Sequence, residues 1–159
     1  TTEKPWYKLN KDYSERNVEV QKITPNSVLN YYKEIIQLRQ RMTALTEGGI
    51  TIIGNDQNVL AYLRHHNDQK VLILLNMSNQ PQYLNSECLS QEIEDSDSIM
   101  IGMSSTNSHI NIPVFGQKFL LQPFEATIFL IVSKSSIFRF LESGESVSLV
   151  VGKVSKTSL

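Results

Sequence analysis

The chain has 159 residues, of which 40% are hydrophobic and 19% are charged, and its formal net charge is −1. This composition is typical of a globular protein with one sizeable core and excludes a wholly disordered chain. The 15 basic and 16 acidic side chains leave no basic surplus, so we expect no nucleic-acid partner. No apolar run approaches the ~20 residues that span a bilayer.

The first 23 residues show no sustained hydrophobic period, although they contain Pro5 and Trp6. We expect an irregular segment that follows the surface of the protein. The chain does not begin with Met and carries no apolar signal-peptide core, which leads us to expect an internal or processed start. The sequence therefore gives no compartment.

Residues 24–45 carry the clearest helical pattern. Thr24 and Pro25 suit the N-cap and the first helical position, and Gly48 and Gly49 end the segment. At about 100° per residue, one half of the helix surface is apolar. The apolar residues are Val28, Leu29, Tyr31, Tyr32, Ile35, Ile36, Leu38 and Met42. So wide an apolar face predicts a helix that packs against two partners.

Arg39 lies in the middle of this apolar face. A guanidinium group in an apolar setting needs a carboxylate or carbonyl partner, because an unpaired buried charge costs several kcal/mol. We therefore predict that Arg39 is a paired, largely buried structural residue. The alternative is a side chain that snorkels to water at the end of the face.

From residue 50 the pattern changes to that of strands, with turns at Gly54–Asp56 and Asn67–Lys70. Residues 71–75 and 127–132 are apolar without alternation, which predicts central strands covered on both faces. Many short strands and one helix indicate a mainly β fold, an antiparallel β-sandwich preceded by one amphipathic helix. The predicted strands are 50–53, 59–66, 71–77, 99–103, 119–121 and 126–132.

Two further segments have distinctive compositions. Residues 85–98 are polar and acidic, and we expect an exposed loop there. Residues 133–159 are rich in serine and contain the apolar stretches 137–141 and 147–151. This tail is either an added hairpin or a segment that packs poorly.

Catalytic and metal-binding motifs are absent from the sequence, and nothing in it calls for a cofactor. His65 and His66 are adjacent, so on a strand they point to opposite faces and cannot share a metal ion. The acidic run 92–97 lacks the glycine and the distal glutamate of a calcium loop. Cys88 is the one cysteine of the sequence, and we expect it to be an inert buried thiol. Asn76-Met77-Ser78 fits the glycosylation sequon and is a weak candidate site.

Several motifs of the chain carry a family resemblance. They are Pro5-Trp6, Asn10, Tyr13, Asn17–Gln21, Pro25–Tyr32, Leu38-Arg39, Val59–Arg64, Val71–Ser78 and Leu121–Ala126. Over about residues 5–132, their order and spacing resemble the carboxy-terminal end of family 13 glycoside hydrolases. The branch they resemble is that of the α-glucosidases, which includes maltases and oligo-1,6-glucosidases.

The resemblance implies a layout of three parts. Residues 1–45 would be the end of a catalytic (β/α)₈ barrel, formed by a loop and the last helix. Residues 46–132 would be the carboxy-terminal β-sandwich domain, and 133–159 the tail. A barrel takes ~250 residues, more than this chain holds. We therefore expect a carboxy-terminal fragment whose partner is the upstream barrel of the same parent chain.

The resemblance also implies where the chemistry lies. In the family, the catalytic carboxylates precede the matched region, so we expect no catalytic residue in this chain. The α-glucoside substrate would bind only to the full-length protein, which would hydrolyse it with retention. The family loop Pro-Trp-Leu-Pro reads Pro5-Trp6-Tyr7-Lys8 here. Trp6, Asn10 and Tyr13 are weak candidates for the substrate side of that loop, with Trp6 a packing anchor or a sugar-stacking ring.

Two other hypotheses remain open from the sequence. Glucosidase-like heavy chains of amino-acid transporters resemble the same family and act as non-enzymatic partners. The upstream sequence would separate the two, because catalytic carboxylates mark an enzyme and an amino-terminal membrane helix without them marks a heavy chain. An independent sugar-binding sandwich would show a row of exposed aromatic residues, and the strands offer little beyond Tyr62.

Overall fold

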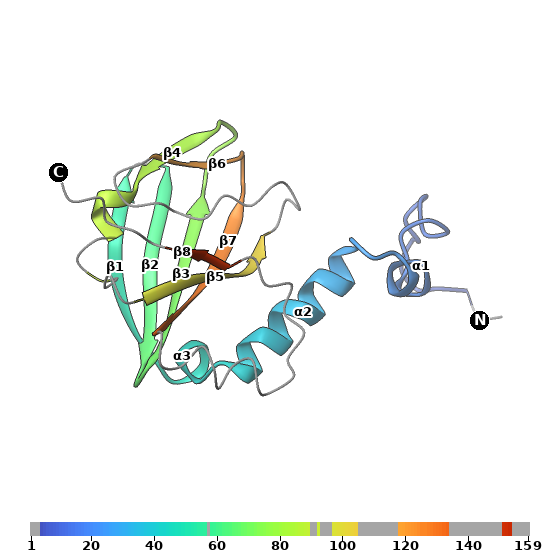
Figure 1. Cartoon of the computed structure of the whole chain (residues 1–159). Helices are drawn as coiled ribbons and strands as arrows, with labels where there is room; N and C mark the ends of the chain where they lie inside the picture. The colour runs from blue at the N-terminus through green and yellow to red at the C-terminus, as the bar shows by residue number, and fades with distance from the viewer. Residues whose placement is uncertain are drawn as a thin grey trace. The chain divides into compact units, whose positions relative to one another are not determined.

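The computed structural model describes residues 4–56, 58–89, 92, 97–104, 118–133 and 151–153. The chain forms two compact units, Thr1–Leu38 and Arg39–Leu159, and helix α2 (Val28–Arg41) has residues in both. Figure 1 shows the helices at the amino-terminal end of the chain and the strands after them. The predicted antiparallel β fold preceded by a helix is confirmed.

The first unit contains a helix that the sequence interpretation missed. Helix α1 (Val18–Ile23) lies within the segment that we expected to be irregular, and that expectation was wrong for these six residues. Asn17 is its N-cap, since its Oδ1 accepts a hydrogen bond of 2.9 Å from the Val20 amide. A helix this short completes less than two turns, so no hydrophobic period reveals it.

Helix α2 begins and ends inside the predicted range 24–45. It starts at Val28 because Ser27 is the cap, its Oγ accepting from the Asn30 amide at 3.2 Å. It ends at Arg41, and Met42 takes an extended conformation before the four-residue helix α3 (Thr43–Thr46). The predicted single helix is therefore interrupted at Met42.

The interruption at Met42 lies in the second unit and is stabilised by contacts within that unit. The backbone amides in the first turn of a helix have no partner within the helix. In α3 one of them, the Ala44 amide, donates to Gln69 Oε1 of a strand at 3.1 Å. Met42 and Ala44 are buried, and α3 packs against the strands β2 and β3. Gly48 then passes so close to the backbone that an added Cβ would lie 2.7 Å from the His65 carbonyl oxygen, which leaves room only for glycine.

The second unit contains two antiparallel sheets. The larger has the strand order β1-β2-β3-β7-β5-β8, and the smaller pairs β4 with β6. The short 3₁₀ helix η1 (Ser86–Leu89) follows β4. The strands are β1 (Gly49–Asp56), β2 (Val59–His66), β3 (Gln69–Asn76), β4 (Gln82–Asn85), β5 (Asp97–Ser104), β6 (Lys118–Leu121), β7 (Ala126–Ser133) and β8 (Val151–Lys153).

The two sheets face each other across one hydrophobic core. The large sheet contributes alternate residues of β2, β3 and β7, and the small sheet and η1 cover them from the other side. Phe119 and Phe129 meet edge to face, with their ring centroids 5.7 Å apart. The buried core residues are Val59, Ala61, Leu63, Leu72, Leu74, Leu84, Leu89, Phe119, Leu121, Phe129 and Ile131.

Leu89 corrects one expectation. Residues 85–98 were expected to form an exposed loop, yet η1 occupies their first part, Leu89 is fully buried and β5 begins at Asp97. The acidic composition of the segment predicted exposure throughout, although Leu89 packs into the core. Strand β4, with Leu84 in the core, was also not predicted, because four residues are too few for a strand pattern.

The prediction of central strands covered on both faces is confirmed for β3 and β7, which are neighbours in the middle of the large sheet. Leu72 and Leu74 point into the core, and Val71 and Ile73, on the opposite face, are buried too. The same holds for Phe129 and its neighbour Leu130 in β7. This double burial explains why these strands read as continuous apolar runs.

The turns connect the strands as their residues allow. Asn67, in the two-residue turn between β2 and β3, has a φ of 51°, a left-handed conformation that asparagine tolerates. The predicted turn at Gly54–Asp56 is instead the last part of β1, after a shift of register between Ile52 and Gly54. In the tail, β8 pairs with β5, and the rest of 134–159 lies outside the described residues.

A polar network joins the end of β3 to the connection between β6 and β7. Asn76 is 3% exposed, and its Nδ2 donates to the carbonyl oxygens of Gln80 and Gln122, each at 2.8 Å. Its Oδ1 accepts from the amide and the hydroxyl of Ser78. The buried Glu125 carboxylate accepts from the Gln122 amide at 2.7 Å. The network thus provides hydrogen-bond partners for backbone groups of Gln80 and Gln122, which lie outside the strands.

Phe124 lies in this connection with a φ of 54° although it is not a glycine. The residue is 67% exposed, so burial of its side chain does not hold it in this conformation. Its amide donates to the Ser78 carbonyl oxygen at 3.0 Å, which ties the strained backbone to the network around Asn76. The left-handed conformation costs about 1–2 kcal/mol for a residue with a Cβ.

Asn76→Ala is expected to lower the free energy of unfolding by about 2–4 kcal/mol, because several buried polar groups lose their partner at once. Chemical denaturation monitored by circular dichroism measures the loss. Asn79→Ala is the matched control, since Asn79 is exposed three residues away and its truncation should change stability by no more than about 0.5 kcal/mol. Equal losses in the two variants would contradict a central role for Asn76.

At Phe124, the order of stability of Gly and Ala variants is expected to be reversed. Alanine is normally the more stabilising residue, but here Phe124→Gly should be more stable than Phe124→Ala by about 1 kcal/mol, because only glycine is free of the left-handed penalty. Both variants remove the same exposed ring, so urea denaturation compares backbone strain directly. An alanine variant as stable as the glycine variant would refute the strain.

Candidate functional site

The candidate glycosylation site is a structural residue. Both polar atoms of the Asn76 side chain are engaged inside the folded unit, as described above. A glycan on Nδ2 would replace hydrogen bonds to Gln80 and Gln122 at a residue that is 3% exposed. The folded structure therefore argues against glycosylation at Asn76. Ser78, two residues later, donates hydrogen bonds to Asn76 Oδ1 from both its amide and its hydroxyl.

Trp6, Asn10 and Tyr13 lie in the loop before α1. Trp6 is 97% exposed and contacts the Tyr7 ring edge-on, with centroids 6.0 Å apart. The Tyr13 amide donates to the Asn10 carbonyl oxygen at 3.2 Å, so these two residues share a turn. Within the described part of the first unit nothing covers the Trp6 ring. Its role as anchor or sugar-stacking residue stays a prediction.

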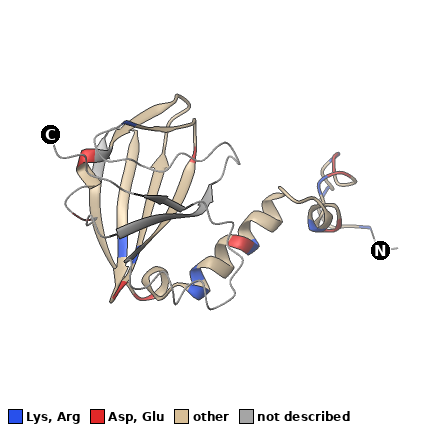
Figure 2. Ribbon diagram, viewed as in Figure 1, with Lys and Arg blue, Asp and Glu red and all other residues tan. Residues whose placement is uncertain are grey.

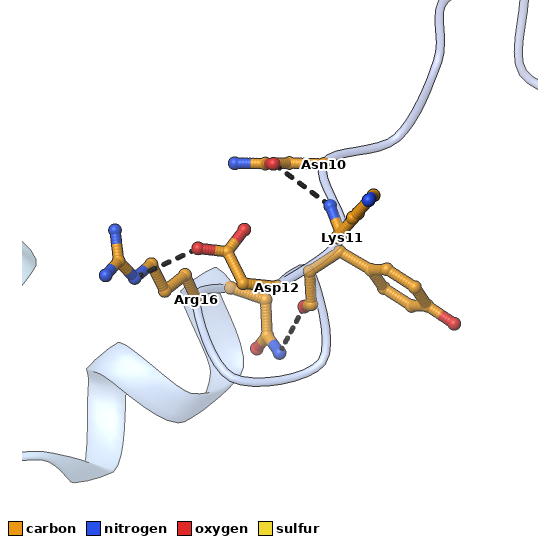
Figure 3. A network of polar contacts seen from close by, with 6 residues as sticks. Asn10, Lys11, Asp12 and Arg16 are labelled. Carbon is orange, nitrogen blue, oxygen red and sulfur yellow. Dashed lines mark hydrogen bonds and ion pairs between the residues drawn. The ribbon is translucent and has the colours of Figure 1, made fainter.

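The loop that carries these residues is held by local polar contacts (Figure 3). The Asp12 carboxylate forms an ion pair of 3.1 Å with Arg16, and Asn10 Oδ1 accepts from the Lys11 amide at 3.0 Å. Asn17 Nδ2 donates to the carbonyl oxygens of Tyr13 and Ser14. These contacts are exposed, so each contributes about 1 kcal/mol or less, and they shape the loop without burying it.

Arg39 is paired but not buried. Its Nη1 donates to the carbonyl oxygen of Leu45, so the guanidinium bridges the interruption between α2 and α3. The residue is exposed, and the prediction that it is largely buried was wrong for this chain. The physical reason is that no residue of α2 is buried. Because the apolar face of the helix is exposed, Arg39 on that face is exposed too.

Helix α2 presents an exposed apolar stripe. Val28, Tyr32 and Ile36 follow one another at four-residue spacing and are 67%, 61% and 51% exposed. Within residues 4–38, only Ser27 is buried. The first unit, taken by itself, therefore has no hydrophobic core of its own. We name these three residues the α2 stripe.

The remaining candidate residues are the histidines, the acidic run 92–97 and Cys88. Among the described residues, no three His, Cys, Asp or Glu side chains converge on a possible metal position. His109, the third histidine of the sequence, and most of the acidic run 92–97 lie outside the described residues. Cys88 is only partly buried, although a buried thiol was expected. Its thiol donates to the Asn85 carbonyl oxygen, and desolvation by burial raises the pKa of Cys88, which favours the protonated thiol over the thiolate.

Charged residues of both signs are dispersed along the described chain, and the strands of the large sheet are mostly uncharged (Figure 2). Both Arg39 and Arg41 lie in the last turn of α2, where they favourably meet the negative end of the helix dipole. In the part of the chain that the structure describes, no helix has the length and apolarity to cross a bilayer.

Two family models match consecutive parts of the chain. "Alpha amylase, catalytic domain" matches residues 1–48, which end after α3. "Maltogenic Amylase, C-terminal domain" matches residues 51–99, which extend from β1 into β5. The change from one model to the other coincides with the change from helices to strands.

Several curated and solved proteins are similar to this chain. The probable oligo-1,6-glucosidase 3 of Bacillus subtilis is 32% identical over 128 residues, 80% of this chain and 22% of the relative. The trehalose-6-phosphate hydrolase of the same organism is 39% identical over 77 residues, 48% of this chain and 14% of the relative. The crystal structure of isomaltulose synthase from Klebsiella sp. LX3 superimposes with a TM-score of 0.67 at 27% identity, over 82% of this chain and 22% of that one.

The chain spans about a fifth of the length of the oligo-1,6-glucosidase and isomaltulose synthase relatives. The two matched family models together cover the helical segment and the strands from β1 to the first residues of β5. The chain belongs to glycoside hydrolase family 13, the α-amylase family, and corresponds to the carboxy-terminal part of its oligo-1,6-glucosidase-like members, with the tail of the catalytic domain and the β domain that follows it.

Proposed function

We propose that this chain is the non-catalytic, carboxy-terminal support of an α-glucosidase. The whole enzyme hydrolyses α-glucosidic bonds of maltose and short oligosaccharides with retention, and the catalytic domain supplies every catalytic carboxylate. The observation that carries the proposal is the exposed α2 stripe, because it lies in the segment that matches the end of a catalytic domain.

We expect the α2 stripe to be buried against another part of the whole enzyme. Burying apolar surface yields roughly 25 cal/mol per Å², and monomeric proteins rarely leave contiguous apolar side chains in water. Val28, Tyr32 and Ile36 are each more than half exposed, on a helix with no buried residue. The remaining part of a catalytic domain is the cover that the match over residues 1–48 favours.

Two of the described carboxylates, those of Asp12 and Glu125, have structural partners. Retaining glycosidases need two carboxyl groups about 5–5.5 Å apart that face the substrate. The Asp12 carboxylate is instead paired with Arg16. Glu125 is buried, and its carboxylate accepts from the Gln122 amide and the Thr127 hydroxyl. Both groups are used to shape loops.

The names of the relatives also favour a supporting role. An oligo-1,6-glucosidase, a trehalose-6-phosphate hydrolase and an isomaltulose synthase share this region and are named for different reactions. A region common to different reactions does not select the substrate, which agrees with specificity residing in the catalytic domain. All three relatives are named as enzymes, and this favours the glucosidase over the transporter heavy chain.

The isolated 159-residue chain should release no glucose from maltose, isomaltose or a chromogenic α-glucoside above a buffer blank. A coupled glucose assay measures this directly. Turnover by the isolated chain that disappears when a carboxylate within residues 4–133 is changed to its amide would overturn the assignment.

The support role can be tested by transplanting this region. In a chimera, residues 4–133 replace the matching part of the B. subtilis oligo-1,6-glucosidase 3, and hydrolysis of isomaltose is measured. Tyr32→Asp/Ile36→Asp in the chimera should lower soluble activity by about tenfold or more, because two charges would be buried at a domain contact.

The matched control for the chimera is Lys33→Asp/Gln37→Asp. These positions are as exposed in this structure as the stripe, but they lie on the polar half of α2. The control should keep the activity within about a factor of two, as surface substitutions usually do. Equal activities of the stripe and control chimeras would show that nothing covers the stripe and would contradict the proposal.

A further inference from the structure

The large sheet ends in two very different ways. One outer strand is β1 and the other is β8, which has only three residues. β8 pairs antiparallel with β5 through Ser98–Lys153, Ile99–Gly152 and Met100–Val151. The other side of β5 is occupied by β7, so β5 would be an edge strand if β8 were removed.

The sequence of β5 makes an open edge hazardous. After the charged Asp97 that begins the strand, residues 98–104 read Ser-Ile-Met-Ile-Gly-Met-Ser and contain neither a charged residue nor a proline. Uncharged, apolar strands with unpaired backbone groups are templates for pairing with another chain. Natural sheets usually interrupt such strands with a lysine or a proline, and β5 has neither in this stretch.

β8 covers the part of β5 that is regular enough to pair. The register of β5 with β7 is continuous from Asp97 to Ile101 and shifts between Ile101 and Met103. A bulge twists a strand and interrupts further pairing, so the pairable part of the edge is 97–101. The three residues that β8 contacts, 98–100, are the middle of that part.

The outer edge of β8 is itself a poor template. It is three residues long and contains Gly152 and Lys153, and short edges with a lysine are the usual protection against further pairing. At the opposite end of the sheet, β1 is interrupted by its register shift between Ile52 and Gly54. With β8 in place, both edges are therefore short or broken.

We propose that β8 is a guard strand, which occupies the edge of β5 and prevents β5 from pairing with a second copy of this chain. The pairing of three residues is weak enough to open locally while the rest of the sheet stays folded. Release of β8 therefore converts the chain from a closed sheet to one that self-associates through β5. The inference rests on the sheet topology and is independent of the enzyme proposed above.

The test removes β8 from the edge within the full 159-residue chain. Neighbouring residues of a strand direct their amides to opposite sides, so Val151→Pro/Gly152→Pro removes a donor toward β5 whichever residue faces it. Thr157→Pro/Ser158→Pro is the matched control, with the same two prolines beyond the strand. Hydrogen exchange of the β5 amides and sedimentation velocity over a wide range of protein concentration are measured for both.

The guard strand predicts that the β5 amides of the 151/152 variant exchange about tenfold faster or more, while β2 and β3 stay protected. The variant should also associate at concentrations where the control is monomeric, and a peptide of residues 147–156 added in trans should reverse this. Equal exchange in variant and control, a variant that opens but stays monomeric, or association that the peptide does not reverse would each overturn the proposal.

A second variant keeps the test valid if the prolines unfold the sheet. Ile99→Cys/Gly152→Cys, on a Cys88→Ser background, places cysteines at directly opposite residues, whose Cα separation in an antiparallel pair suits a disulfide. The oxidised chain, with β8 locked, should stay monomeric under mild heating that makes the reduced chain associate. Equal association of the two forms would refute the guard strand.

Discussion

Burial of β3 and β7 on both of their faces is the constraint on which the rest of the structure depends. These strands are neighbours in the middle of the large sheet, and Val71, Leu72 and Leu130 are almost completely buried although they do not share one face. One face requires the small sheet and η1 as cover, and the opposite face requires another. α3, which packs against β2 and β3 after the interruption at Met42, contributes to the packing around them.

Continuous patterns made most of the fold predictable from the sequence. The strand 59–66 was predicted with its observed bounds, and the apolar runs at 71–75 and 127–132 predicted the two central strands. The short elements α1, β4 and η1 were missed, since four to six residues give no period. Asn17 was the available signal for α1, as an N-cap residue before a short helix-compatible run.

The residues singled out for function were harder to place. The apolar face predicted for 24–45 is exposed along α2, and the predicted burial of Arg39 depended on a cover that no described residue provides. Asn76 was identified from a sequon, whereas its hydrogen bonds reach Gln122 across 46 positions of sequence. Such long-range polar partners follow from sheet topology and leave no local trace in the sequence.

The position of Asn76 has a consequence for how the chain is produced. The triplet Asn76-Met77-Ser78 is an acceptor for a glycosylating enzyme only before β3 closes against the rest of the sheet, since the amide is enclosed afterwards. In a eukaryotic secretory host, sugar transfer and sheet closure would compete for the same nitrogen. A chain that is modified first would lack the hydrogen bonds of Asn76 at the end of β3. The yield of native protein would therefore depend on the rate of folding relative to the rate of sugar transfer during synthesis.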